Sequence, residues 1–156
     1  MTSNSVSQEL IDKLEPVNVQ DVDALNNGSH LDITIEAEKI RTAVEILSES
    51  KYFMEDLTAV DMGSYREMAY RFNQYSEPNR ITIRVDLGPE DEIDSVQDIF
   101  SSADWLEREC YEFLGVKFNG HPDLRNLLLP EDFDTHPLRK DFVVPKEALA
   151  PEYHKD

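Results

Sequence analysis

The chain has few of the residue types on which many functions depend. A single cysteine, Cys110, excludes an intrachain disulfide and any zinc or iron–sulfur framework built on several cysteines. Lys and Arg number 15 against 33 Asp and Glu, giving a formal charge of −18, and the bases are scattered singly except for Arg139-Lys140. Such a surface repels phosphate backbones and anionic lipids, so binding to nucleic acid or directly to a membrane surface is disfavoured.

Long apolar runs and sequence motifs for cofactors are also lacking. No stretch approaches the roughly 18 consecutive apolar residues that a membrane span needs. The first residues have no basic start and no apolar middle, so we expect no secretory signal or transit peptide, and hence a reducing cytoplasm. No Gly-rich phosphate loop, dinucleotide fingerprint or nucleophile elbow occurs.

The apolar pattern predicts one α+β domain. The length of 156 residues, with 40% apolar and 31% charged residues, is typical of a single globular domain. Along the chain, segments in which apolar residues recur every three to four residues alternate with segments in which they recur every two. We expect helices at 7–14, 37–50 and 104–114, and strands at 30–36, 53–62, 67–75 and 79–87. A turn at 76–79 predicts an antiparallel hairpin, so the fold class is a two-layer α+β domain whose mixed, mostly antiparallel sheet carries helices on one face.

The last helix has predicted caps and is followed by an extended region. Asp104 and Glu107 have the spacing of a capping box, Gly115 stands where a C-cap belongs, and Cys110 falls on the apolar stripe as a small buried residue. Prolines punctuate the rest, which favours extended backbone. The sequence therefore predicts an α+β domain at 1–115 and extended, Pro-rich, partner-binding loops and tail at 116–156, with 143–156 ordered only against a partner.

Residues 104–142 carry a long motif with fixed spacing, DWLERECYEFLGVKFNGHPDLRNLLLPEDFDTHPLRKDF. Its blocks are Glu-Arg-Glu at 107–109, Glu-Phe-Leu at 112–114, His-Pro-Asp-Leu-Arg at 121–125, Pro-Glu-Asp at 130–132 and His-Pro-Leu-Arg-Lys-Asp at 136–141. The motif resembles the signature of the C subunit of NADH:quinone oxidoreductase, the thirty-kilodalton-type subunit family of respiratory complex I. Asn126 stands where that family usually has a second basic residue.

The resemblance implies a non-catalytic peripheral subunit on the cytoplasmic side of the membrane. Members of the family stabilise the quinone-reducing module beside its large subunit and contact the membrane only through the complex. NADH, flavin, iron–sulfur clusters and quinone are then expected on partner subunits, and no cofactor is expected on this chain. The same subunit type occurs in membrane-bound hydrogenases and ferredoxin-linked complexes, which is the alternative.

The residues of the motif also allow interpretations that do not depend on the family. Glu107, Arg108 and Glu109 are adjacent on a helix and cannot converge on one substrate, so we expect a charged helix face meeting a partner or solvent. Arg108 and Glu112 are spaced to pair on that surface.

Two histidines in the motif raise the possibility of a metal site or of a free-standing hydrolase. His121 and His136, with Asp123 and Asp134, include metal-ligand types, but the two histidines are too far apart in sequence for an ordinary zinc site. Histidines before proline in loops more often orient backbone, so we expect no metal.

The bases of the motif stand out in so acidic a chain. Arg125, Arg139 and Lys140 are expected to make charge-assisted bonds to carboxylates of a partner or of this domain, with another chain favoured for Arg139. No catalytic, cofactor-binding or metal-binding residue is expected. The predicted subunit interface consists of Glu107, Arg108, Glu109, Glu112, His121, Asp123, Arg125, His136, Arg139, Lys140 and Asp141.

Overall fold

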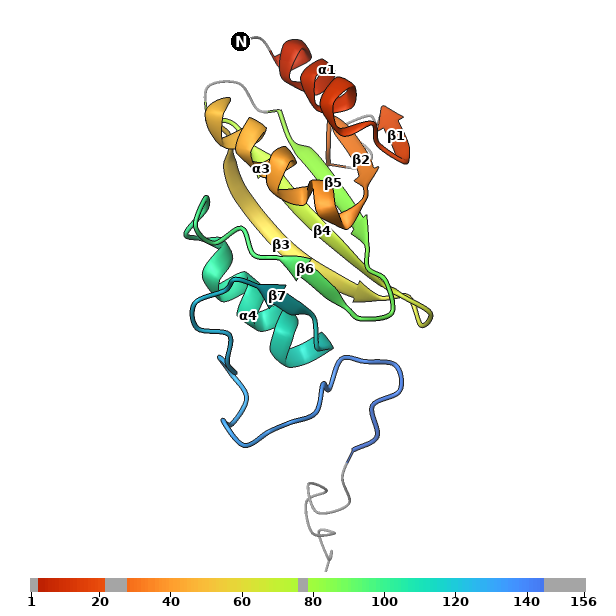
Figure 1. The fold of residues 1–156 in the computed structure, drawn as a ribbon, viewed down its shortest axis with the longest axis vertical. Coiled ribbons are helices and arrows are strands. Elements are labelled where there is room, and N and C mark those ends of the chain that lie inside the picture. Colours follow the sequence, from red (N-terminus) through yellow and green to blue (C-terminus); the bar gives the residue numbers. More distant parts are fainter. Residues whose placement is uncertain (1–2, 22–27, 76–78, 145–156) are drawn as a thin grey trace, which may run out of the picture.

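The computed structural model describes residues 3–21, 28–75 and 79–144 (Figure 1). Its helices are α1 (Ser3–Leu14), the 3-10 turn η1 (Ala37–Lys39), α3 (Ile40–Glu49) and α4 (Ala103–Leu114). Its strands are β1 (Asn18–Asp21), β2 (Leu31–Ile35), β3 (Phe53–Asp61), β4 (Arg66–Asn73), β5 (Ile81–Asp86), β6 (Glu92–Asp94) and β7 (Lys117–Asn119). Every helix and strand that the apolar periodicity predicts is therefore present.

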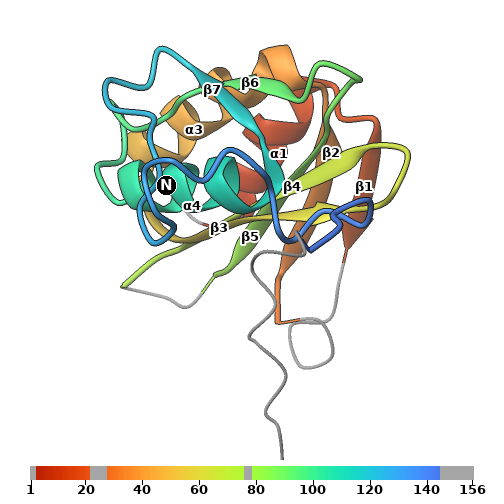
Figure 2. The same ribbon diagram turned by 90° about the horizontal axis from the view of Figure 1, so that it is seen from below.

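The main sheet has the strand order β1-β2-β5-β4-β3. Only β2 and β5 run parallel, whereas β1–β2, β5–β4 and β4–β3 are antiparallel. The helices lie on one face of this sheet, as the view from below shows (Figure 2). The predicted fold class is confirmed.

Alternation along the strands divides the sheet into an apolar and a polar face. Ile33, Ile83, Tyr70 and Leu57 follow one another across four strands in register, and all four are buried beneath the helices. The residues next to these four in sequence lie on the opposite face, as Arg84 does. This arrangement accounts for the alternation of apolar and polar residues along β5.

Three short strands were not predicted. The acidic run at 90–94 is typical of a solvated loop, yet it contains β6, whose Ile93 is buried and which pairs in parallel with β7. Because β7 lies beyond residue 115, the folded part of the chain continues past the end expected for the α+β domain. β1 adds a four-residue edge to the sheet beside β2.

The two ends of α4 differ in how well the sequence predicts them. The predicted capping box is wrong: the N-cap is Ser102, no side chain caps the first turn, and Glu107 bonds elsewhere. Gly115 is confirmed as the C-cap, with a left-handed φ of 77° that favours glycine.

After β7 the chain forms an irregular segment, residues 121–144, which contains no helix or strand and which we call the strap. In Figure 1 the strap runs from the end of β7 around α4 toward the β3–β4 end of the sheet. Most of the tail predicted to order against a partner, residues 145–156, lies outside the described residues.

Candidate subunit interface and the signature helix

Three charged residues of the signature on α4 point into the protein rather than out of it. Glu107 and Glu112 on α4 are 0% and 1% exposed, and Arg108 is also buried, whereas Glu109 between them is exposed. The expected charged helix face meeting a partner or solvent is therefore wrong for Glu107 and Arg108, and Glu112, expected on the helix surface, is buried as well. Buried charges require bonding partners, and each of the three has them within this chain.

Glu107 fastens α4 to the segment that follows β6. Its carboxylate accepts a hydrogen bond of 2.6 Å from the Ser95 hydroxyl and one of 2.8 Å from the Val96 backbone N–H. Burial raises the pKa of Glu107, and the two hydrogen bonds oppose that rise. The role of Glu107 is structural, since both of its oxygens are engaged and neither reaches solvent.

Arg108 and Glu112 bind the backbone of the strap instead of each other. The Arg108 guanidinium donates to the carbonyls of Arg125 and Asn126 at 3.1 and 3.0 Å. The Glu112 carboxylate accepts the backbone N–H groups of residues 127–129 at 2.8, 2.9 and 3.1 Å. The predicted pairing of Arg108 with Glu112 on the helix surface is wrong, because each side chain is hydrogen-bonded to backbone groups of the strap instead.

The last signature block, residues 136–141, caps the C-terminus of α4. A helix leaves its last carbonyls without intrahelical partners. Here the carbonyls of residues 112–114 accept bonds from the His136 ring (Nδ1, 3.0 Å), the Leu138 backbone N–H (3.0 Å) and the Arg139 guanidinium (Nε, 2.8 Å). The His136 ring lies so close to Gly115 that a Cβ there would be 2.7 Å from ring atoms. Residue 115 is therefore glycine for space as well as for its positive φ.

His121 is enclosed and has both ring nitrogens engaged. Its side chain has no exposed surface. Nδ1 accepts the Asp123 backbone N–H at 3.1 Å, which requires the proton on Nε2, 3.3 Å from the Asp104 carbonyl. Glu107 lies 3.9 Å from Nε2. A ring held in this way orients backbone and cannot reach a substrate.

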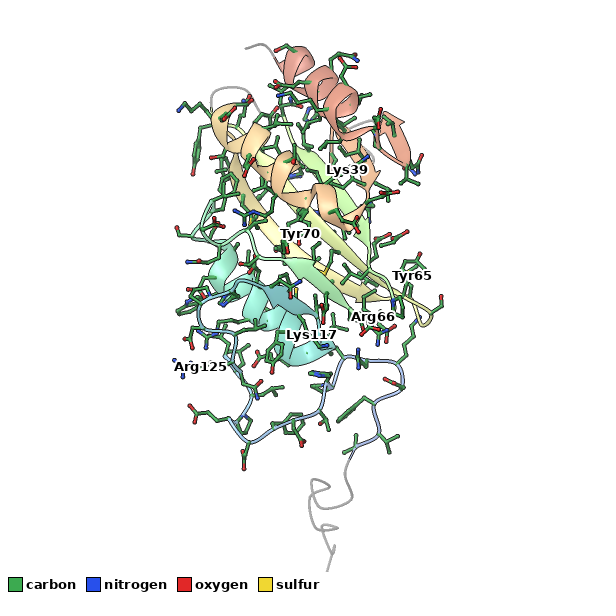
Figure 3. The ribbon with its side chains drawn as sticks, viewed as in Figure 1. Lys39, Tyr65, Arg66, Tyr70, Lys117 and Arg125 are labelled. Atoms are coloured by element: carbon green, nitrogen blue, oxygen red, sulfur yellow. The ribbon has the colours of Figure 1, made fainter. Side chains whose placement is uncertain are left out.

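Arg139 pairs within the domain rather than with another chain. Its Nη2 lies 2.7 Å from the Asp91 carboxylate, whose side chain is 8% exposed, and Arg66 approaches the same carboxylate at 3.4 Å. Figure 3 shows Arg66 at the hairpin end of the sheet, next to the strap. The expectation of a partner chain for Arg139 is wrong, since Asp91, hidden in the acidic run at 90–94, supplies the carboxylate.

The remaining signature residues are on the surface. Arg125 pairs with Asp123 at 2.9 Å, and Lys140 uses its backbone N–H to reach Asp61 at 2.8 Å, which joins the strap to the end of β3. Glu109, Arg125 and Lys140 are exposed, and so is Asp141. Their part in a subunit interface stays a prediction. Asn126, at the position where a base was expected, braces the strap by donating to the Pro130 and Phe133 carbonyls.

A small pocket in the described part of the chain lies away from the signature blocks. It has a volume of about 170 Å³ and is lined by residues of η1, β6 and β7 that belong to none of the signature blocks: Ala37, Glu38, Glu92, Ile93, Asp94 and Asn119. Within residues 3–21, 28–75 and 79–144, no three His, Cys, Asp or Glu side chains are grouped so as to hold a metal. Cys110 is buried as predicted, and burial raises the pKa of its thiol to about 12.

The chain is similar in sequence to known proteins. Residues 33–148 match the family described as respiratory-chain NADH dehydrogenase, 30 Kd subunit. The NADH-quinone oxidoreductase C subunit of Geobacter sulfurreducens is 41% identical over 117 residues, covering 70% of this chain and 72% of that protein. The C subunit of the same enzyme from Rhodopseudomonas palustris strain BisB18 is 37% identical over 130 residues, covering 76% and 65%.

Two solved structures share the fold. A trypsin-resistant fragment (1–134) of Nqo5 superposes with a TM-score of 0.64 at 25% identity and covers 80% of this chain and 100% of the fragment. A chain of the archaeal membrane-bound sulfane sulfur reductase superposes with a TM-score of 0.77 at 21% identity and covers 98% and 95%. By sequence and by fold, the chain belongs to the 30 kDa subunit family of respiratory-chain NADH dehydrogenase, a family of complex I-type oxidoreductase subunits.

Proposed function

We propose that this chain is a non-catalytic peripheral subunit that stabilises the quinone-reducing module of a complex I-type NADH:quinone oxidoreductase. One observation carries the proposal. The charged signature residues on which a catalytic role would depend are buried in bonds to this chain's own backbone, as Glu112 is to residues 127–129. A family signature used in this way builds a rigid scaffold rather than an active site.

The scaffold would sit on the cytoplasmic side of the membrane, beside the large subunit of the quinone site. None of the helices in the described part of the chain is long and apolar enough to cross a bilayer. The charge of −18 disfavours direct contact with an anionic lipid surface and so favours attachment to the membrane through other subunits. NADH, flavin, iron–sulfur clusters and quinone would be bound by those subunits. The purified chain is then expected to lack visible absorption and stoichiometric metal.

The decisive experiment is recovery of the tagged chain from detergent-solubilised membranes of its own organism. We expect it to bring down the quinone-site large subunit together with flavin- and iron–sulfur-containing NADH dehydrogenase subunits. Recovery of the chain alone, or turnover of a substrate by the purified chain, would contradict the proposed function. Turnover abolished by His121→Ala would point to the hydrolase interpretation, against which the burial of His121 speaks.

A second candidate keeps the subunit type and changes the complex. The fold is shared with a chain from an archaeal respiratory membrane complex whose name is sulfane sulfur reductase. The equivalent subunit of a membrane-bound hydrogenase or a ferredoxin-linked complex is therefore a related possibility. The same recovery experiment separates the two: flavoprotein subunits that bind NADH favour complex I, and a nickel-containing large subunit favours a hydrogenase.

A further inference from the structure

Large exposed apolar side chains gather on the strap. Four of those in the described residues belong to this segment: Leu128, Leu138, Val143 and Val144. Leu128 and Leu138 are 69% and 62% exposed. Single exposed apolar residues are ordinary on a protein surface, but several on one segment are typical of an interaction site.

The two leucines are held outward by bonds to one turn of α4. The Leu128 N–H donates to the buried Glu112 carboxylate at 2.9 Å, and the Leu138 N–H donates to the Phe113 carbonyl at 3.0 Å. These bonds fix the backbone of both residues while their side chains remain in water. A rigid, exposed leucine loses little conformational freedom on binding, which favours association.

Unpaired acidic groups lie on the same segment as the leucines. Asp132, Asp134 and Asp141 are exposed and make no ion pair within the described part of the chain. Two exposed bases belong to the strap: Arg125 is already paired with Asp123, whereas the side chain of Lys140 makes no ion pair within the described residues. The strap therefore carries exposed apolar side chains together with more unpaired acids than unpaired bases, and the complementary surface is apolar at its centre and basic at its rim.

The open face of the sheet has a different character. Its central base, Arg84, bonds to Asp32 at 2.9 Å and to Glu67 at 2.6 Å, so the main charges of that face satisfy one another. A second copy of this chain is also a poor occupant for the strap, because it would bring acidic groups against acidic groups.

We propose that the strap is a docking surface for a partner subunit whose facing surface has an apolar centre and a basic rim. Leu128 and Leu138 are the anchors, and the acidic groups of the strap set orientation and rate of encounter. This inference rests on the proposed function and deepens it. The contact with the partner subunit is thus made by Leu128 and Leu138, which the signature holds in place. Glu107, Arg108 and Glu112 are buried and do not contact the partner.

The test compares Leu128→Asp with Val17→Asp in the tagged full-length chain. Val17 is also 69% exposed and its N–H is also bonded, to the Thr34 carbonyl at 2.8 Å, but it lies beside β1 rather than on the strap. Both variants should melt like the wild type, because neither side chain is buried. We expect recovery of the complex with Leu128→Asp to fall about tenfold or more, as for an interface anchor, and with Val17→Asp to fall less than about twofold.

Charge reversal tests the basic rim. Asp132→Lys with Asp134→Lys should weaken recovery at low salt, while the matched pair Glu45→Lys with Glu49→Lys on α3 should leave it unchanged. If the wild type recovers the complex and both Asp variants at 17 and 128 do so equally, the strap proposal is overturned. If sedimentation shows a wild-type dimer that Leu128→Asp dissolves, the occupant is a second copy and the proposal is again overturned. If the wild type itself recovers no partner, the proposed function fails first.

Discussion

Removing the Glu112 carboxylate should detach the first half of the strap from α4. Glu112→Ala leaves the three N–H groups of residues 127–129 without their acceptor. A hydrogen bond to a charged group contributes about 1.5–3 kcal/mol, but water can reach the partly exposed strap and replace part of that. We therefore expect the free energy of unfolding to fall by about 3 kcal/mol. At about 2–4 °C per kcal/mol for a chain of this size, Tm should fall by about 6–12 °C.

The matched control is Glu109→Ala, which removes an exposed carboxylate from the same helix and should change stability by less than about 0.5 kcal/mol. Urea unfolding followed by circular dichroism gives both free energies. Hydrogen exchange adds local information, because the amides of residues 127–129 should lose protection in Glu112→Ala while those of the main sheet keep theirs. Equal destabilisation by the two variants, or unchanged protection at 127–129, would refute the assignment of Glu112 as the anchor of the strap.

Three further outcomes follow from the same region. The Cys110 thiol, with a pKa raised to about 12, should resist alkylation in the native protein and react at the rate of unfolding in urea; rapid native labelling would contradict its burial. The pKa of Glu107 is raised above 4.5, so between pH 4.5 and the pKa of the folded state the folded protein binds more protons than the unfolded chain. The free energy of unfolding should therefore fall as the pH rises from 4.5 through the folded-state pKa. Glu107→Gln should flatten this decline, measured as urea midpoint against pH, and parallel curves would exclude the residue as its source. Gly115→Ala should destabilise by more than about 1 kcal/mol, and by less in a His136→Ala background, since the added Cβ meets that ring; additive effects in the double-mutant cycle would exclude the contact.

The sheet and its helices were predictable because half-buried elements leave a period in the sequence. β5 alternates Ile81, Ile83 and Val85 with polar residues, and the structure buries the apolar set. β6 and β7 have three residues each, too few to show a period, and they pair only because the chain brings 92–94 beside 117–119. Their existence depends on tertiary contacts that sequence patterns do not contain.

The signature residues were found by type and spacing, but their orientation was not. Because charged side chains usually lie on protein surfaces, the sequence predicts that Arg108 and Glu112 are exposed on the helix. Their partners are backbone groups of the strap. Backbone groups are nearly the same in every residue, so the residue types of the strap do not reveal these bonds. One signal was present: the Leu-Leu-Leu run at 127–129 follows no strand period, so its N–H groups required an acceptor other than a neighbouring strand. The burial of Asp91 could not be predicted either, because in sequence it does not differ from the solvated acids of the run at 90–94.

The bonds around Glu112 explain why the block at 112–114 and the block at 136–141 occur together in one family signature. The side chain of Glu112 holds residues 127–129, and its carbonyl accepts a bond from His136. The two halves of the strap thus attach to one helical turn, through different atoms of one residue. Fraying of that turn would release both halves together, which makes α4 and the strap a single cooperative unit. A partner that binds the strap therefore also stabilises α4, and a substitution in either block is expected to weaken assembly even where it contacts no other subunit.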